Sequence, residues 1–349
     1  MSSHSRKPAT CMAIMAVSAF VVLVLASQTI SFAQQRGVNR RMEEEAKKRG
    51  WKLRTPVSES GWDDHNLSRE EAISLSMISS AAQGLEWYKA RSAWEKSSQG
   101  KTPLYNSVMH AAYRCGQYGY GRSIFRRMCK KSLPKNSITF NCAIRLFVQS
   151  NETDKVFELW DEAKSQTGSW ERRQIYLLMS EMVNAMGDFG NITGVITFLD
   201  LILKEELEID EGTWGSALNG CKVAGKPHTA KYFLEEMRSR SVPINLIHYT
   251  HAIAAHAGRK LESITAFAKM VAQTGIDIDE YFVEMHVTSL MGSLRRTHET
   301  KNMADVRKVV SKAKPSHAAE ALRVIEASTS KGMKLTRLTR RFHQALLEP

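Results

Sequence analysis

The sequence predicts an all-α protein: a right-handed α-solenoid of stacked helix-turn-helix hairpins with a period of about 35 residues. Two recurring features predict this fold class. A bulky aromatic residue returns once per period, and a glycine or asparagine follows it at a nearly constant distance. Apolar residues also make up 43% of the chain, which is enough for a packed interior and excludes wholesale disorder.

The repeats share one register over residues 102–279. The aromatic positions are Tyr105, Phe140, Tyr176, Trp214 and Tyr249. The turn positions are Gly116, Asn151, Gly187, Gly225 and Gly258. Because Gly and Asn tolerate the left-handed conformation that ends a helix, each is predicted to close the first helix of a hairpin. The second helices should bury their bulky apolar positions, which are Phe125, Trp160, Leu199, Leu234 and Phe267.

The N-terminus departs from this pattern. Residues 11–27 form an uncharged apolar run, and small residues at 31 and 33 resemble a cleavage site. Residues 1–33 are therefore predicted to be a secretory signal peptide. An uncleaved membrane anchor is the alternative, because about 20 apolar residues span a bilayer. In that case residues 11–27 would be the chain's membrane contact.

Residues 34–67 are predicted to be a basic linker or transit segment. A signal-type leader followed by a basic stretch resembles the leaders that direct proteins into complex plastids. Three consecutive glutamates, at 43–45, instead favour an exposed charged helix over residues 40–50. The predicted location is an organelle, a plastid in the first instance, with a mitochondrion or a membrane-anchored state as alternatives.

The remaining elements flank the array. Residues 68–101 resemble a degenerate hairpin that caps the stack, and residues 280–349 form an atypical C-terminal helical repeat with a basic cap. Five cysteines occur without a C-x-x-C pair. Two disulfides among the four beyond residue 33 are an alternative, but a chain of this length favours buried free thiols.

Several segments resemble the pentatricopeptide repeat. They begin at Thr102 (Thr-Pro-Leu-Tyr-Asn-Ser-Val-Met), at Ser137 (Ser-Ile-Thr-Phe-Asn-Cys-Ala-Ile), at Glu211 and at Leu246. The tetratricopeptide repeat is the competitor, but its small residue in the first helix and its closing proline do not recur here. The resemblance implies that the concave face binds single-stranded RNA, one base per repeat.

In this family the fifth residue of the first helix and the last residue of the repeat meet the base edge. The implied pairs are Asn106 with Asn136, Gly215 with Asn245, and Thr250 with Asp279. Two further fifth-position residues have less certain register: Asn141, paired with Glu171 or Arg172, and Leu177, paired with Asp210. Residues at the second position, Ile138 and Ile247 foremost, would wedge between bases. For each Asn or Thr the alternative is a hydrogen bond that caps a helix. Gly215 has no side-chain group to offer a base.

The excess of basic residues and the absence of catalytic sequence motifs limit the classes of function. Lys and Arg number 49 against 36 Asp and Glu, which favours a polyanionic partner, either nucleic acid or an anionic membrane. No P-loop, G-x-S-x-G or H-E-x-x-H motif is present. We therefore expect no catalytic residue, no metal and no cofactor.

The predicted function is that of a single-stranded RNA-binding adaptor, not an enzyme, in organellar RNA processing, stability or translation. Other RNA-processing proteins are candidate partners. One alternative is a protein-binding α-solenoid scaffold that is anchored to a membrane. A third hypothesis is that the chain is a subunit of a nuclease whose active site is completed by another chain.

Overall fold

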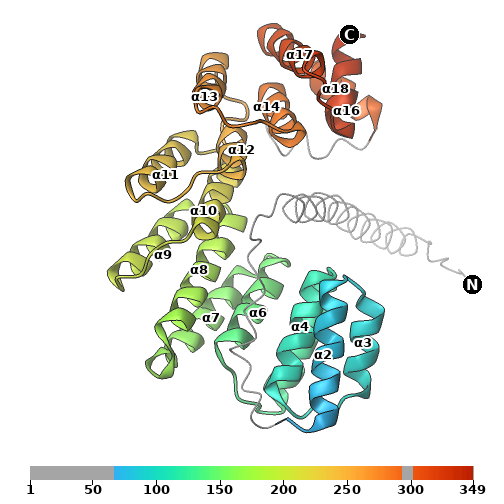
Figure 1. Cartoon of the computed structure of the whole chain (residues 1–349), viewed down its shortest axis with the longest axis vertical. Coiled ribbons are helices and arrows are strands. Elements are labelled where there is room, and N and C mark those ends of the chain that lie inside the picture. The colour runs from blue at the N-terminus through green and yellow to red at the C-terminus, as the bar shows by residue number, and fades with distance from the viewer. Residues whose placement is uncertain (1–66, 293–301, 349) are drawn as a thin grey trace, which may run out of the picture. The chain divides into compact units, whose positions relative to one another are not determined.

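The computed structural model of the protein describes residues 67–292 and 302–348, and over these residues it contains α-helices and no strand (Figure 1). All of them belong to one compact unit, residues 62–349. Helical hairpins follow one another along this unit, so the predicted fold class is confirmed.

The first helices of the hairpins form a continuous row, because each packs directly against the next first helix. They are α2 (Arg69–Gln83), α4 (Thr102–Arg114), α6 (Ser137–Val148), α8 (Arg172–Asp188), α10 (Glu211–Ala224), α12 (Leu246–Ala254) and α14 (Glu280–Met291). Contact with sequential neighbours alone is the property that lets a solenoid be built from repeats.

Each second helix packs against the first helix of its own hairpin, and all of them except α7 also pack against the first helix that follows. They are α3 (Trp87–Lys96), α5 (Tyr118–Lys130), α7 (Thr153–Lys164), α9 (Ile192–Lys204), α11 (Pro227–Ser239) and α13 (Leu261–Gln273). A short 3-10 turn, η3 (Thr167–Ser169), precedes α8.

Three helices complete the C-terminus: α16 (Met303–Val310), α17 (Pro315–Ser330) and α18 (Arg337–Leu347). The helix α17 packs against α14 as a second helix would, and α18 contacts α14, α16 and α17. Its N-cap residue, Thr336, donates a hydrogen bond to the Glu284 carboxylate of α14. The helix α18 thus continues the row of first helices, with α16 as an added element beside it.

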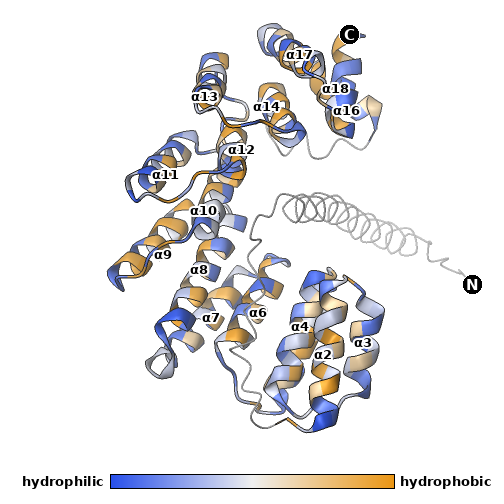
Figure 2. Cartoon of the chain, in the orientation of Figure 1, coloured by the Kyte–Doolittle hydropathy of each residue, from blue (hydrophilic) through white to orange (hydrophobic). Residues whose placement is uncertain are grey.

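The core lies between the helices, and most helices in Figure 2 have an apolar side and a hydrophilic side. The register aromatics Tyr105, Phe140, Trp214 and Tyr249 are at most 4% exposed. The five second-helix positions predicted to be buried are all buried, with exposures of 9% or less. Tyr176 is the exception in the aromatic series: it is half-buried, and its hydroxyl bonds to Thr213 and accepts from the backbone N–H of Asp210.

The hairpin turns use residues with a left-handed backbone. Gly116, Asn151, Gly225 and Gly258 have φ values of 68°, 59°, 61° and 74°, as predicted. The prediction for Gly187 is wrong: this residue lies inside α8, and the turn falls at Gly190 (φ 67°).

Gly187 serves a different purpose. A Cβ atom there would lie 2.6 Å from the carbonyl oxygen of Ser216, and one at Gly220 would lie 2.9 Å from the Cα of Gly187. The missing side chains let α8 and α10 approach closely, and so the residue is a packing glycine instead of a turn glycine.

Two other predictions concern the cysteines and the membrane. No disulfide joins Cys115, Cys129, Cys142 or Cys221, but only Cys142 and Cys221 are buried, and Cys129 is exposed, against the prediction of burial. Within residues 67–292 and 302–348 no helix has the length and apolarity needed to cross a membrane. The apolar run 11–27 and the basic segment after it lie outside the described residues.

Candidate nucleic-acid interface

The last residue of each predicted pair caps the next first helix. The Asn136 side chain accepts from the N–H of Thr139 (3.0 Å), and the Asp279 carboxylate accepts from the N–H of Phe282 (2.8 Å). Asn245 does the same for the N–H of Ile247 (2.9 Å). Capping fixes one oxygen of each side chain at the point where two hairpins meet. The structure thus shows the capping alternative at all three positions.

Asn106 and Asn136 are brought together. The Asn106 Nδ2 donates to Asn136 Oδ1 over 3.1 Å, and the Thr139 hydroxyl donates to Asn106 Oδ1 over 2.8 Å. Asn106 is 1% exposed, and its side-chain amide donates one hydrogen bond and accepts one within the chain. The two residues that the family resemblance pairs are therefore neighbours from successive hairpins, joined directly and also through the Thr139 hydroxyl.

The other predicted pairs are not joined in this way. The Thr250 hydroxyl donates to the carbonyl of Leu246 in its own helix (2.7 Å), while Asp279 caps α14. Gly215 is half-buried and offers no side chain, and the Asn245 amide instead donates to the Glu211 carboxylate. A base at the Gly215–Asn245 position would meet only one polar side chain of the pair.

Asn141 differs from both groups. It is 7% exposed, and its Oδ1 has no hydrogen-bond partner among the residues that the structure describes. A buried polar oxygen without a partner is costly, so this amide is the fifth-position side chain most in need of an additional donor.

The predicted wedge residues differ in access. Ile138 is buried at 7% exposure, which disfavours insertion between bases, whereas Ile247 is half-buried. Both roles remain predictions.

A row of polar side chains on the first helices was not predicted from the sequence. It is formed by Arg145, Glu181, Asn184, Asp188, Asn219 and Lys222, and we call it the polar row. Its members occur four, seven or eleven residues after a fifth-position residue, and these spacings place them on the same helix face. Four-residue spacing after Asn141, Leu177 and Gly215 was the signal available in the sequence.

Arg145 connects three first helices. Its guanidinium is 2.6 Å from the carboxylate of Glu181 on α8 and lies 5.8 Å from the ring centre of Tyr113 on α4. Glu181 is 1% exposed. Burial lowers the pKa of His110 to about 4, and the positive charges of Arg145 and Arg114 add to that effect. The Arg145 charge is thus neutralised within the chain, and His110 is uncharged at neutral pH.

The second part of the polar row lies on α8 and α10. The Asn219 amide donates to the Asp188 carboxylate over 3.0 Å. Asp188 is exposed at the end of α8, yet desolvation by the surrounding protein and the nearby Glu181 charge raise its pKa to about 6. Burial lowers the pKa of Lys222, and the negative charges of Asp188 and Glu284 only partly offset this effect. Lys222 forms no ion pair within 4 Å with any residue in the described ranges, so its ammonium group would gain from an anionic ligand.

No metal site emerges: within the described residues no three His, Cys, Asp or Glu side chains lie together as ligands. His248 has a structural role, because its Nδ1 accepts from the N–H of Asn245 (3.0 Å) and its Nε2 lies 3.2 Å from the carbonyl oxygen of Glu211.

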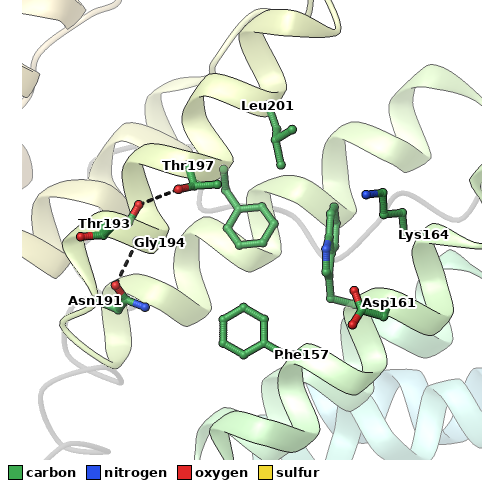
Figure 3. A pocket seen from close by; sticks show the side chains of 10 residues that line it. Phe157, Asp161, Lys164, Asn191, Thr193, Gly194, Thr197 and Leu201 are labelled. Carbon is green, nitrogen blue, oxygen red and sulfur yellow. Dashed lines mark hydrogen bonds between the residues drawn. The ribbon is translucent and has the colours of Figure 1, made fainter.

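A surface hollow of about 410 Å³ lies between the second helices α7 and α9 (Figure 3). It is lined by Phe157, Trp160, Asp161, Lys164, Asn191, Thr193, Gly194, Thr197, Phe198 and Leu201. None of these residues belongs to the polar row or to the predicted pairs. The hollow is therefore separate from the candidate interface on the first helices.

Hairpins in a row, with paired polar positions where successive first helices meet, define the chain as a helical-repeat protein. The pentatricopeptide repeat model matches residues 104–133, 138–166 and 212–242. These three segments of the chain are accordingly pentatricopeptide repeats, as the sequence resemblance indicated.

Curated relatives are distant. The small ribosomal subunit protein mL103 of Arabidopsis thaliana is 20% identical over 189 residues, which cover 45% of this chain and 46% of that protein. A pentatricopeptide repeat-containing protein of the same plant is 20% identical over 236 residues, 66% of this chain and 29% of that protein. The chain thus spans less than half the length of either relative.

Solved structures agree on the fold. The pentatricopeptide repeat protein PPR10, in complex with an 18-nucleotide psaJ RNA element, aligns with a TM-score of 0.54 at 14% identity. The alignment covers 90% of this chain and 50% of PPR10. At this identity the likeness establishes the shared helical-repeat fold.

Proposed function

We propose that the chain binds single-stranded RNA along its row of first helices, as a non-catalytic adaptor. The observation that carries the proposal is the Asn106–Asn136 hydrogen bond, because it places the two side chains of a predicted base-reading pair side by side. An amide offers both a donor and an acceptor, the combination needed to match a base edge.

Asn141 supports the same proposal. Its unpartnered Oδ1 would accept a hydrogen bond from an exocyclic amine of a base, which would remove the cost of leaving it unsatisfied. Lys222 would act differently, since a desolvated ammonium without an ion pair suits a backbone phosphate and does not select bases. Along the row of first helices, the region around Asn106 and Asn141 would thus read bases, and the region around Lys222 would hold the RNA backbone.

The test is selection from a randomised RNA pool at about 150 mM salt. We expect enrichment of a short motif by the unaltered chain, and loss of preference at one position in each of Asn106→Ala and Asn141→Ala. Each lost base contact should reduce discrimination by about 1–3 kcal/mol. Asn191→Ala is the control, because Asn191 is an amide that caps the second helix α9, outside both the polar row and the predicted pairs. If no motif is enriched, the proposal is wrong.

The process and the location are proposed more broadly. We place the chain in organellar RNA processing, stability or translation. A plastid reached by the signal-type leader is preferred over a mitochondrion or a membrane-anchored state. The ribosomal relative supports a role close to translation. Imaging of the chain with a C-terminal fluorescent tag, with and without residues 1–67, tests the location.

A protein-binding scaffold is the second candidate. Leu177 and Gly215 provide no polar group at two fifth positions, which limits RNA selectivity, and Phe157 beside the α7–α9 hollow is 38% exposed. Affinity capture with and without ribonuclease separates the candidates. Partners of an RNA adaptor should be lost after digestion, whereas those of a scaffold should stay bound.

A further inference from the structure

The positive charge of the chain is unevenly distributed. Residues 102–279, which contain the predicted base-reading pairs, have 21 basic and 19 acidic residues. Residues 302–348 have 10 basic and 4 acidic residues. We call this second segment, made of α16, α17 and α18, the basic cap. The excess that favours a polyanionic partner therefore lies mainly outside the repeats that would select bases.

The cations of the basic cap lie on exposed surface. Arg337 and Arg340 are exposed on α18, whereas Thr339, Phe342 and Ala345 on the opposite side of that helix are at most 1% exposed. Three-residue spacing puts the two arginines on one face. The turn before α18 adds two more exposed cations, Lys331 and Lys334.

These four cations have no ion pair with any residue in the described part of the chain, whereas two other cations of the basic cap do. Arg307 pairs with Glu348 at 2.9 Å, and Arg323 pairs with Glu320 at 2.6 Å. Uncompensated, solvated cations grouped on one surface condense anions, and a polyphosphate chain gains most because it releases its own counterions.

The position of α18 favours RNA as that polyphosphate. The helix continues the row of first helices, since it packs against α14 and its N-cap Thr336 bonds to Glu284. A strand lying along the row would reach α18 after α14. An anionic membrane is less well matched, because Leu347 is the one large apolar residue counted as exposed among described residues 302–348, so few side chains are available to insert.

We propose that Lys331, Lys334, Arg337 and Arg340 form a sequence-independent phosphate-binding surface that holds the RNA segment next to the array. The proposal rests on RNA binding by the first helices. It adds that a second, non-selective site supplies much of the electrostatic affinity. Base preference reports on the first helices and salt dependence reports on the basic cap, so the two proposals can be refuted separately.

The test replaces these four residues with Gln in the full chain and measures RNA affinity from 50 to 200 mM salt. Each lost phosphate contact lowers the salt slope by about 0.7, so the slope should fall by about 3 and the unaltered chain should lose about 50-fold more affinity over this range. The base preference should stay the same. The matched control removes four exposed cations from second helices: Lys130, Lys164, Lys204 and Arg238.

RNA length gives a second readout. The selected RNA is extended by about five nucleotides at its 5′ end or at its 3′ end. Relative to the unaltered chain, the Gln variant should lose affinity for only one of these two extended RNAs. Circular dichroism melting confirms that both variants are folded.

Equal salt slopes in the two variants, with selective RNA binding intact, would overturn the basic-cap proposal and leave the proposed function standing. The same holds if the four cations bind phosphatidylserine vesicles but do not alter the RNA slope. Absence of RNA binding by the unaltered chain would instead refute the proposed function.

Discussion

The array, residues 102–279, and the basic cap are packed alike but present different chemistry. In the array, polar side chains bond to one another across successive first helices, as in Asn106–Asn136 and Arg145–Glu181. In the basic cap, the four cations Lys331, Lys334, Arg337 and Arg340 are exposed and have no ion pair within the described residues. The predicted selective hydrogen-bonding groups are thus in the array, whereas the basic cap has the larger net positive charge. The net charge of the chain therefore says little about its selective surface.

The largest effect should come from core truncations that compare the two regions. Phe140 and Phe342 are both fully buried, the first in the array and the second in α18. Phe140→Ala and Phe342→Ala should each cost about 3–5 kcal/mol. Since hairpins contact only their neighbours, Phe342→Ala should unfold the basic cap and spare the array. Base preference should then survive Phe342→Ala at a lower salt slope, and it should be lost with Phe140→Ala.

Calorimetry together with RNA selection checks this pair. Two separate unfolding transitions in Phe342→Ala would support independent regions. A single transition, with equal loss of base preference in both variants, would show that the basic cap and the array unfold as one unit.

The next effect concerns the close approach of α8 and α10 in the array. Gly187→Ala should destabilise the chain by about 1–3 kcal/mol, because the new Cβ overlaps the Ser216 carbonyl. Gly119→Ala is the control: Gly119 is exposed on α5 with open space around it, so this change should be neutral or slightly stabilising. Urea unfolding measures both. Equal midpoints would mean that α8 and α10 can move apart freely.

Gly187 also shows which structural role could not be predicted from the sequence. The spacing of aromatics and glycines was sufficient to predict the hairpins, because turn geometry and core burial leave a periodic trace. The same spacing assigned Gly187 to a turn, since a glycine that permits a left-handed turn and one that permits close packing look identical in a single sequence. Only the placement of α10 distinguishes them.

The candidate interface was partly predictable. Fifth-position residues follow from the register, and Asn106 does meet Asn136. The pairing of Arg145 with Glu181 depends on how α6 and α8 are offset, and residues 36 apart give no local signal of it. The basic residues near the C-terminus were evident in the sequence. Which of them have ion pairs required side-chain positions.

A smaller effect should follow from removing the charge that neutralises Arg145. Glu181→Gln keeps the shape of the buried side chain but leaves Arg145, whose side chain is 28% exposed, without its counter-charge. We expect a stability loss of about 1–2 kcal/mol, below that for a fully buried pair because solvent reaches the arginine. RNA affinity at low salt should rise, since the array gains a free cation. Unchanged or weaker binding would show that Arg145 does not face the strand.

The smallest effect is a pH dependence that the array should show and the basic cap should not. Because desolvation by the surrounding protein and the Glu181 charge raise the pKa of Asp188 to about 6, the native chain takes up a proton here between about pH 6 and pH 4. The stabilisation from this proton is present at low pH and is lost as the pH rises through 6. Protonation also removes a negative charge from the polar row. RNA binding should therefore strengthen by about 2- to 5-fold from pH 7 to pH 5, which is the range of a partly solvated charge interaction.

Asp188→Asn should bind at pH 7 as the unaltered chain does at pH 5. At each pH the RNA affinity of Asp188→Asn is divided by that of the unaltered chain, so that the titration of other groups, which affects both proteins, cancels. His110 and His286, both with a pKa lowered to about 4 by burial, stay neutral over this range. Asp200→Asn, an exposed carboxylate on the second helix α9, removes the same charge away from the row and should leave the ratio constant. A constant ratio for Asp188→Asn as well would place the Asp188 carboxylate outside the reach of the RNA, and would confine charge sensing to the basic cap.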